Sequence, residues 1–353
     1  MKVKPVVDAL EHRRVDVTLV HTGQHYDTAM SDVFFADIGL RAPDRNLGVG
    51  SGSHAEQTGR VMTSFEPVLE EVCPDVVVVV GDVNSTLACA LVAAKSGSLV
   101  AHVEAGLRSR DWTMPEEINR VVADRLSDFL FAPSEDAVSN LCREGYRQDQ
   151  IYLVGNVMID TLLANLDRAQ QRPILQTLGL TRSGYGLVTL HRPANVDDRV
   201  VLARLLSALA SVAALCPLVF PVHPRTRAHL AKIAVPDGIS FIEPAGYLDF
   251  VALQAGAKFV LTDSGGVQEE TTVLGVPCLT LRDNTERPIT ITHGTNTLVG
   301  SDPDRIISQV RRVLDHGVEQ RRPPLWDGRA GDRIADILVQ SHGDRHLRPT
   351  DLP

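Results

Sequence analysis

The chain has 353 residues, a length that favours two domains over one. Hydrophobic residues make up 44% and charged residues 22%, which is typical of a globular protein and excludes a disordered one. The formal net charge is −9 and no basic block occurs, which argues against nucleic acid or an anionic membrane as the main partner. No apolar run reaches the roughly 20 residues that span a bilayer, and residues 1–11 lack the apolar core of a signal peptide.

The five cysteines are odd in number and lack the spacing of metal ligands. We therefore interpret them as buried thiols of a protein in a reducing cytoplasm. Neither an HExxH nor a CxxC pattern occurs, so we expect no metal site.

Short apolar segments alternate with helical patterns along the chain, beginning with a predicted helix at residues 2–14. Strands are predicted at residues 15–20, 75–82, 98–106, 128–133 and 151–156, and then at 185–192, 217–224, 240–246, 258–266 and 277–283. Helices are predicted between them, most clearly at residues 115–126 and 200–215.

These strand segments are apolar throughout, which is typical of strands buried on both faces of a parallel sheet. The alternation predicts an α/β protein with two Rossmann-like, doubly wound domains. A polar stretch at residues 165–184 suggests the boundary, with one domain at 1–165 and the other at 166–330.

The segment "LTDSGGVQEE" at residues 261–270 leaves a predicted strand and opens a helix. In open parallel sheets, ligands bind beyond the carboxyl ends of the strands, where helix N-termini hold phosphate. Gly265 and Gly266 would let a diphosphate approach the backbone, Ser264 adds a donor, and Glu270 could accept bonds from ribose hydroxyls. The segment therefore suits a nucleoside diphosphate and matches neither GxxxxGK[ST] nor GxGxxG. The alternative is a glycine turn followed by a capped helix.

Polar residues also follow other predicted strands, although each has a structural alternative. Asp82 and Glu116 could be helix caps, Arg108 could simply pair with an acid, and His102 is more easily explained as a packed histidine than as a catalyst. The glycine-rich residues 48–54 follow no convincing strand, and we interpret them as a loop. A cluster of acids at the ends of one sheet still indicates a functional site.

Ten strings give the chain a resemblance to a known family, the non-hydrolysing UDP-N-acetylglucosamine 2-epimerases. They occur in the family order over nearly the whole length: "TGQHYD", "VGDVNST", "HVEAGLRS", "MPEEINR", "VGNVMID", "LHRPANVDD", "VHPRTR", "TDSGGVQEE", "LRDNTERP" and "WDGRAGDRI". The resemblance implies the glycosyltransferase-B fold, in which the two domains face each other across a cleft. It also implies a C-terminal helix, at residues 331–345, that rejoins the first domain.

The resemblance implies the site residues as well. Three acids, matched by Asp82, Glu104 and Glu116, would carry the proton chemistry, and His191 would lie near the diphosphate. Ser264, Gly265, Gly266, Glu270 and Arg287 match family residues that hold UDP, and Phe250 matches an aromatic residue beside uracil. Lys2 is also expected to bind the substrate. Gln24, His25 and His223 fall in segments that bacterial members use for a second, activating UDP-sugar. A UDP-sugar substrate, a homodimer and a cytoplasmic location follow as expectations.

The expected chemistry explains these residue types. Carbon 2 of a UDP-sugar is not next to a carbonyl, and no dinucleotide fingerprint is present to oxidise a neighbouring carbon. The remaining route expels UDP from carbon 1 while a base removes the carbon 2 proton, and then adds UDP back with protonation from the other face. This route needs carboxylates as base and acid, and donors for the departing diphosphate, but no cofactor.

The sequence departs from the family pattern at the front and in one motif. The family's first strand and its Gly-Thr-Arg-Pro-Glu loop are missing, and only Lys2 and Pro5 match that segment. We expect such a strand to be encoded ahead of residue 1. Ala194 stands where the family commonly has Glu. Two other functions remain open: a glycosyltransferase of the same fold, and a non-catalytic protein that binds UDP-sugars.

Overall fold

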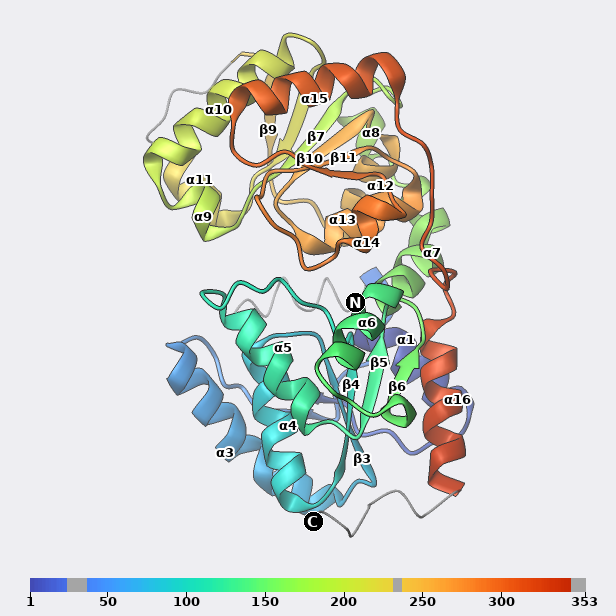
Figure 1. Ribbon diagram of the computed structural model, residues 1–353. Helices are drawn as coiled ribbons and strands as arrows, with labels where there is room; N and C mark the ends of the chain where they lie inside the picture. Colours follow the sequence, from blue (N-terminus) through green and yellow to red (C-terminus); the bar gives the residue numbers. More distant parts are fainter. Residues whose placement is uncertain (24–36, 231–236, 344–353) are drawn as a thin grey trace. The chain divides into compact units, whose positions relative to one another are not determined.

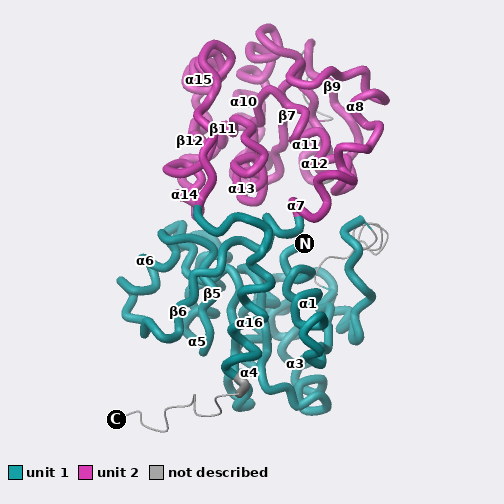
Figure 2. The backbone as a smooth tube through the Cα atoms, turned by 90° about the vertical axis from the view of Figure 1, so that its right-hand side faces the viewer, with its two compact units in different colours: residues 1–161, 324–353 teal, residues 162–323 magenta. Residues whose placement is uncertain are grey.

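The structure is a computed structural model that describes residues 1–23, 37–230 and 237–343 (Figure 1). The chain divides into two compact units (Figure 2). Unit 1 consists of residues 1–161 and 324–353, and unit 2 of residues 162–323.

The main sheet of unit 1 has four parallel strands in the order β3-β4-β5-β6, with helices on both sides. Its elements are α1 (Val3–His12), β1 (Val20–His21), β2 (Arg45–Asn46), α3 (His54–Val72), β3 (Val76–Val80), α4 (Asn84–Ser96), β4 (Leu99–Val103), α5 (Pro115–Leu126), β5 (Phe129–Ala132), α6 (Glu135–Arg143), β6 (Ile151–Leu153) and α16 (Ala330–Gly343). Helix α7 (Val157–Gln170) runs from unit 1 into unit 2.

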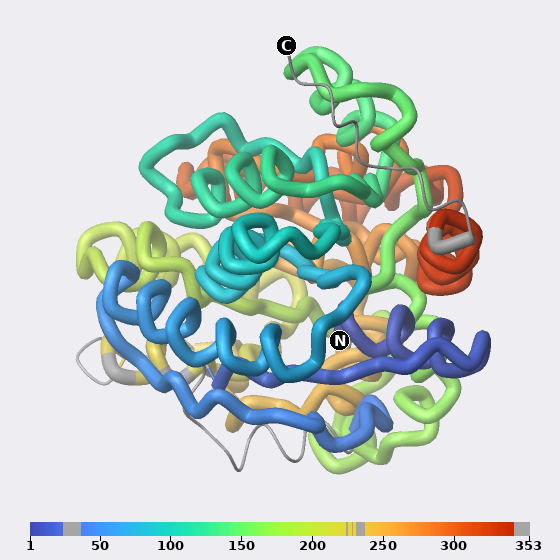
Figure 3. Tube along the Cα trace, turned by 90° about the horizontal axis from the view of Figure 1, so that it is seen from below, coloured from blue at the N-terminus to red at the C-terminus, as the bar shows by residue number. Residues whose placement is uncertain are grey.

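Apolar cores cover both faces of this sheet. On one side α1 and α16 pack against β4 and β5, and Arg13 of α1 is paired with Asp332 and Asp336 of α16. On the other side lie α3 and α4, which Figure 3 shows side by side. The C-terminal helix therefore completes the core of the N-terminal part of the chain.

The strand predicted at residues 15–20 is much shorter than expected. Only Val20–His21 is a strand, and it pairs with Arg45–Asn46 in a separate two-stranded sheet. Within the described part of the chain, β3 pairs with β4 alone, and four of its five residues are half-buried, whereas β5 is buried throughout. A strand needs a hydrogen-bonded neighbour to persist, and β1 has only the two residues of β2.

Unit 2 is a six-stranded parallel sheet in the order β12-β11-β10-β7-β8-β9. Its elements are α8 (Ile174–Thr177), β7 (Gly186–Thr189), α9 (Pro193–Val196), α10 (Arg199–Ala213), β8 (Leu218–Pro221), α11 (Pro224–Leu230), β9 (Ile239–Ile242), α12 (Tyr247–Gly256), β10 (Phe259–Thr262), α13 (Gly265–Leu274), β11 (Cys278–Thr280), α14 (Ile289–Thr292), β12 (Asn296–Leu298) and α15 (Pro303–His316). The doubly wound α/β architecture predicted from the sequence is confirmed.

The continuous apolar runs of unit 2 arise because the strands β7, β8 and β10 each feed two cores. Val188 and Leu261 face a core formed with α10 and α15, whereas Leu187 and Val260 face a second core formed with α12 and α13. Successive side chains of a strand point to opposite faces, so a strand covered on both sides is apolar at every position.

Two further sequence-based expectations can be compared with the structure. Cys89, Cys216 and Cys278 are buried as expected, but Cys73 and Cys142 are exposed, so the interpretation of all five as buried thiols is wrong. Cys73 ends α3 with its side chain outward, and composition carries no information on such a position. In the described ranges, no helix is long and apolar enough to cross a membrane.

Candidate functional site

Unit 1 gathers acids at the carboxyl edge of its sheet. Asp82 follows β3, Glu104 directly follows β4, and the two strands are parallel neighbours. Glu116 lies in the first turn of α5. The same helix reaches Asp82 one turn later, because Asn119 donates to the Asp82 carbonyl oxygen at 2.9 Å. Neither Asp82 nor Glu116 is a helix cap, since Val83 and Met114 occupy those positions.

Asp82 is held by a buried arginine. Arg120 of α5 is 2% exposed, and its Nη2 donates to Asp82 Oδ2 at 2.7 Å. Its Nη1 contacts the buried carboxylate of Glu117. The second glutamate of "MPEEINR" is therefore a structural ion, and it leaves Glu116 as the acid of this pair that is only partly buried.

Glu104 has a backbone conformation that residues other than glycine rarely adopt. Its φ is 78°, in the left-handed region, and the N–H groups of Glu104 and Ala105 both donate to the Phe131 carbonyl oxygen at 3.1 Å. The Glu104 carboxylate is ion-paired with Lys2. Lys2, predicted to bind substrate, thus lies beside a predicted catalytic acid. Strain of this kind is common at functional sites.

A buried network lies directly behind these acids. His102 is fully buried; its Nδ1 is 2.6 Å from Asp124 Oδ1, and its Nε2 is 2.8 Å from the Gly81 carbonyl oxygen. Burial disfavours the imidazolium, yet the Asp124 carboxylate and the Gly81 carbonyl raise the pKa of His102. Arg108 pairs with Asp124 at 2.7 Å. The interpretations of His102 as a packed histidine and of Arg108 as an ion-pair partner agree with these contacts.

In unit 2 the centre of the site is Asp263, to which the sequence analysis gave no role. It is buried directly after β10, and it accepts from the backbone N–H groups of His191 and Arg192 and from Asn195 Nδ2. His191 Nδ1 lies 2.9 Å from Asp263 Oδ1. Burial raises the pKa of Asp263, but His191 and the backbone donors lower it by more. Its position directly after an apolar strand could have identified Asp263 as a candidate site residue.

The helix after Asp263 begins at Gly265. Ser264 is its N-cap residue, but its side chain forms no capping hydrogen bond. A Cβ on Gly265 would lie 2.5 Å from Arg287 Nη1 and 2.8 Å from Glu286 Oε1. The absence of a side chain at Gly265 therefore leaves room for the Arg287 guanidinium, which is a different reason from the diphosphate expected from the sequence. Gly266, the next residue, is partly exposed.

Arg287 belongs to a buried ionic network at the start of α13. Its Nε lies 2.7 Å from Glu269 Oε1, and its Nη1 contacts Glu286. Burial opposes ionisation of Glu286, but Arg287, Arg282 and Arg192 lower its pKa. The network holds a guanidinium beside the helix N-terminus.

Glu270 lies one turn into α13 and is only 3% exposed. Its carboxylate accepts from Gln254 Nε2 at 2.6 Å and from the Tyr247 hydroxyl at 3.4 Å, both on α12. Burial raises the pKa of Glu270 to about 7. Phe250, predicted to lie beside uracil, is on the same helix α12 and is partly buried.

The residues expected at an activating site are only partly described. Gln24 and His25 lie outside the described residues. The ring centroid of His223 is 5.8 Å from that of His191, so these two predicted site residues are neighbours in unit 2. Burial, and then His191, lower the pKa of His223. Across the part of the chain that the structure describes, no three or more His, Cys, Asp or Glu side chains form a group that could hold a metal ion.

The two Rossmann-like units, with an acid cluster in one and a glycine-opened helix in the other, define an α/β protein of the glycosyltransferase-B class. The family model for UDP-N-acetylglucosamine 2-epimerase matches residues 8–339. The chain belongs to this family.

Individual relatives are similar over almost their whole length. The UDP-N-acetylglucosamine 2-epimerase of Methanocaldococcus jannaschii is 44% identical, over 96% of this chain and 95% of the relative. A crystal structure of the M. jannaschii enzyme in complex with UDP-GlcNAc and UDP has a TM-score of 0.89 at 43% identity, covering 96% of both chains. The UDP-2,3-diacetamido-2,3-dideoxy-D-glucuronate 2-epimerase of Pseudomonas aeruginosa is 40% identical, over 94% of this chain and 93% of the relative.

Proposed function

We propose that the protein epimerises carbon 2 of a UDP-N-acetylhexosamine, converting UDP-N-acetylglucosamine to the manno epimer. The observation that carries the proposal is the acid cluster of unit 1, where Asp82 and Glu104 end adjacent strands and Glu116 begins α5. Family membership and the relatives named for this activity support it.

The proposed reaction is an elimination followed by an addition. A carboxylate removes the carbon 2 proton while the bond between carbon 1 and the UDP oxygen breaks, which leaves a glycal and free UDP. UDP then attacks carbon 1 as an acid protonates carbon 2 from the opposite face. Two carboxyl groups of the protein beside the sugar suffice as base and acid, so no redox cofactor takes part.

Unit 2 is proposed to hold UDP. The uncapped N-terminus of α13 offers backbone N–H groups to the diphosphate, and Arg287 and His191 add donors that stabilise it as it departs. Ser264, Gly265 and Gly266 would line this contact, Glu270 would accept from ribose, and Phe250 would lie beside uracil. Lys2 would act from unit 1, where its ammonium now contacts Glu104.

Incubation with UDP-N-acetylglucosamine in deuterated water tests the reaction. Epimerisation by this route incorporates one deuterium at carbon 2, which mass spectrometry and NMR detect. A glycosyltransferase or a non-catalytic binding protein would leave carbon 2 unlabelled. The same incubation with the 2,3-diacetamido glucuronate analogue tests the activity named for the P. aeruginosa relative.

Substitution of the three acids tests their roles. Asp82→Asn, Glu104→Gln and Glu116→Gln should each lower kcat by roughly 10²–10⁴-fold, because each removes a proposed base, acid or orienting carboxylate. UDP affinity, measured by calorimetry, should stay within a few-fold because UDP is assigned to unit 2. Near-normal turnover in any variant would remove that residue from the catalytic set.

The remaining partners are also part of the proposal. We infer a homodimer in the cytoplasm, with no nucleic acid or membrane partner. A second UDP-sugar would act as an activator, with His223, Gln24 and His25 contributing. Sigmoidal dependence of the rate on UDP-N-acetylglucosamine, lost in His223→Ala, would support this activating site.

A further inference from the structure

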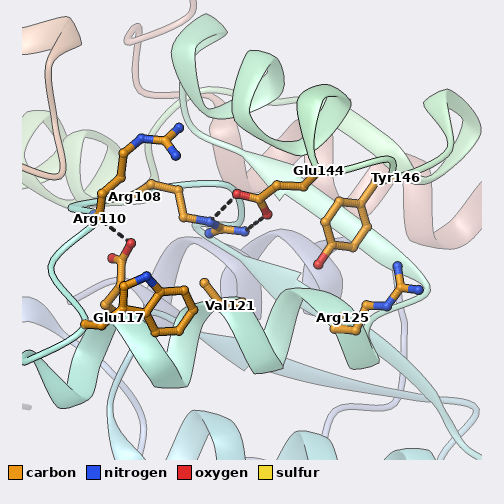
Figure 4. Close-up of a pocket in the computed structure, with 8 residues that line it drawn as sticks. Arg108, Arg110, Glu117, Val121, Arg125, Glu144 and Tyr146 are labelled. Atoms are coloured by element: carbon orange, nitrogen blue, oxygen red, sulfur yellow. Dashed lines mark hydrogen bonds and ion pairs between the residues drawn. The ribbon is translucent and has the colours of Figure 1, made fainter.

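Unit 1 contains a cavity of about 450 Å³ that is separate from the acid cluster (Figure 4). It lies among the loop at residues 107–114, the outer side of α5 and the turn that follows α6. Its lining includes Arg108, Arg110, Trp112, Arg125, Glu144 and Tyr146. A volume of this size accommodates a small-molecule ligand.

The cavity is more basic than its composition suggests, because its two carboxylates already form ion pairs and hydrogen bonds with other groups. Glu144 is paired in a bidentate manner with Arg108, at 2.9 and 2.7 Å. Glu117 is saturated by Ser109, Arg120 and the backbone N–H of Arg110. Positive charge on Arg110 and Arg125 is therefore left without a carboxylate partner among the described residues.

A second arginine converges with Arg110 on one neutral atom. Arg110 Nη2 donates to Asn140 Oδ1 at 3.0 Å, and Arg143 Nη2 donates to the same oxygen. Within the described ranges neither guanidinium has a carboxylate ion pair. Two like charges on one amide oxygen repel each other, and an anion bound between them would remove that repulsion.

The backbone of Arg110 is held in place by a buried carboxylate. Its φ is 60°, in the left-handed region, and its N–H donates to Glu117 Oε1 at 2.8 Å. Figure 4 shows this bond, and it shows the Arg110 side chain extending away from Glu117. The buried carboxylate of Glu117 thus holds the backbone of the loop from which the exposed Arg110 side chain extends.

An aromatic surface adjoins these charges. The Trp112 side chain lines the cavity and is 64% exposed, which is unusual for the largest apolar side chain. On the far side, the Arg125 guanidinium lies 5.8 Å from the centroid of the Tyr146 ring. An exposed indole beside uncompensated guanidiniums suits a ligand that has both an anionic group and a ring with an apolar face.

We propose that a sugar phosphate binds at the Arg110 edge of this cavity, with the phosphate on Arg110 and on Arg143, which adjoins Arg110 at Asn140, and with the sugar ring against Trp112. Guanidinium groups bind phosphate oxygens in a bidentate manner, and an indole face packs on the C–H surface of a pyranose. The site lies within unit 1 and shares no residue with the proposed UDP contacts of unit 2.

Tryptophan fluorescence of the full chain tests this site. The chain has only two tryptophans, and Trp326 is 1% exposed. A change in fluorescence caused by a ligand in the cavity therefore comes from Trp112. Titration with N-acetylglucosamine 1-phosphate should give a saturable change that Trp112→Phe abolishes. Arg110→Gln and Arg143→Gln should each weaken binding by about tenfold or more. Arg311→Gln, on the exposed side of α15, removes the same charge elsewhere and should change affinity by less than about twofold.

Inorganic phosphate and uridine monophosphate are the comparison ligands. Both should bind more weakly than the sugar phosphate, because phosphate lacks the ring and the nucleotide places a base where the pyranose fits. Tighter binding of either one would overturn the assignment to a sugar phosphate. A titration that does not saturate, or equal losses in Arg110→Gln and Arg311→Gln, would overturn the site itself.

Discussion

At the scale of single residues, the acids of unit 1 are held by basic partners. Arg120 holds Asp82 and Lys2 holds Glu104, whose left-handed φ costs roughly 1–3 kcal/mol for a residue other than glycine. The surrounding contacts must stabilise that conformation, and the paired N–H bonds of Glu104 and Ala105 to Phe131 do so. The backbone at Glu104 is thus fixed by its neighbours and not by its own side chain, so Glu104→Gln tests the carboxylate alone.

His102 gives unit 1 a pH-dependent stability. Both of its ring nitrogens face acceptors, so the imidazolium satisfies both contacts and the folded-state pKa lies above 6.5. A raised pKa contributes stability that is fully present below pH 6.5 and is lost as the pH rises through the folded-state pKa. The free energy of unfolding should therefore fall above pH 6.5, by at most about 1.4 kcal/mol per pH unit from this group. His102→Gln should flatten that slope in urea unfolding between pH 6.5 and 9.

The matched control for this experiment is His316→Gln. His316 is exposed at the end of α15, so the same chemical change there should leave the slope as it is in the parent chain. An unchanged slope in His102→Gln would show that the buried imidazole does not exchange its proton on folding. Because His102 also holds the Gly81 carbonyl, the variant should shift the position of Asp82 and lower kcat as well.

The raised pKa of Glu270 leads us to expect that the affinity for UDP depends on pH. This pKa is raised to about 7 by burial, and ribose hydroxyls would donate more strongly to the ionised carboxylate than to the protonated acid. From pH 8 to pH 6 the ionised fraction falls by about tenfold, so UDP affinity measured by calorimetry should fall by up to about tenfold. Glu270→Gln should remove this dependence and weaken UDP more than pyrophosphate, which has no ribose. Equal losses for the two ligands would show that Glu270 only braces Gln254 and Tyr247.

At the scale of elements, continuous apolar runs identified strands β3 to β11 because these strands feed apolar cores, β7, β8 and β10 on both faces. Strands β2 and β12 were missed, since Arg45–Asn46 is exposed and Asn296–Leu298 begins with a polar residue. Helix α5 has the predicted bounds, Pro115–Leu126, because proline marks its first turn. Local pattern thus finds elements with distinct chemistry and misses those that depend on a neighbour.

The site was predictable only in part for a related reason. Acids that follow an apolar strand stand out in the sequence, and Asp82 and Glu104 were recognised in this way. The buried charges Arg120 and Asp124 did not stand out, because charged residues spaced along a helix resemble an ordinary solvated face. Only the packing of α5 against α4 and β4 shows that this face is interior.

The role of Gly265, the first residue of helix α13, can be tested by substitution. Gly265→Ala should weaken UDP binding, because the added Cβ would lie 2.5 Å from Arg287 Nη1 and push the guanidinium out of its network. Calorimetry should show a loss of about tenfold, as for a removed charged hydrogen bond. Gly59→Ala in α3 is the matched change, since nothing lies within 4 Å of its Cβ. It should stabilise the protein by about 0.4–1 kcal/mol and leave UDP binding unchanged.

At the scale of the whole molecule, unit 1 is built from two separated parts of the chain. Residues 324–343 return to it, with Ala330 and Ile334 in the core beneath β4 and β5. Gly331 N–H donates to Asp160 Oδ2 at 2.7 Å, and Trp326 Nε1 donates to the Pro133 carbonyl oxygen at 2.9 Å. The stability of unit 1 therefore depends on the last part of the chain, whereas unit 2 is continuous in sequence.

Trp326→Ala should consequently destabilise unit 1 selectively. The indole is 1% exposed, so its removal leaves a cavity and an unsatisfied carbonyl, at a cost of about 3–5 kcal/mol. Hydrogen exchange measured by mass spectrometry should show lost protection in β3, β4, β5 and β6, with β7, β8 and β10 protected as before. Trp112→Ala is the matched control: that side chain is 64% exposed, and its removal should change stability by less than about 0.5 kcal/mol. Equal loss of protection in both sheets of Trp326→Ala would mean that the two units unfold as one cooperative body.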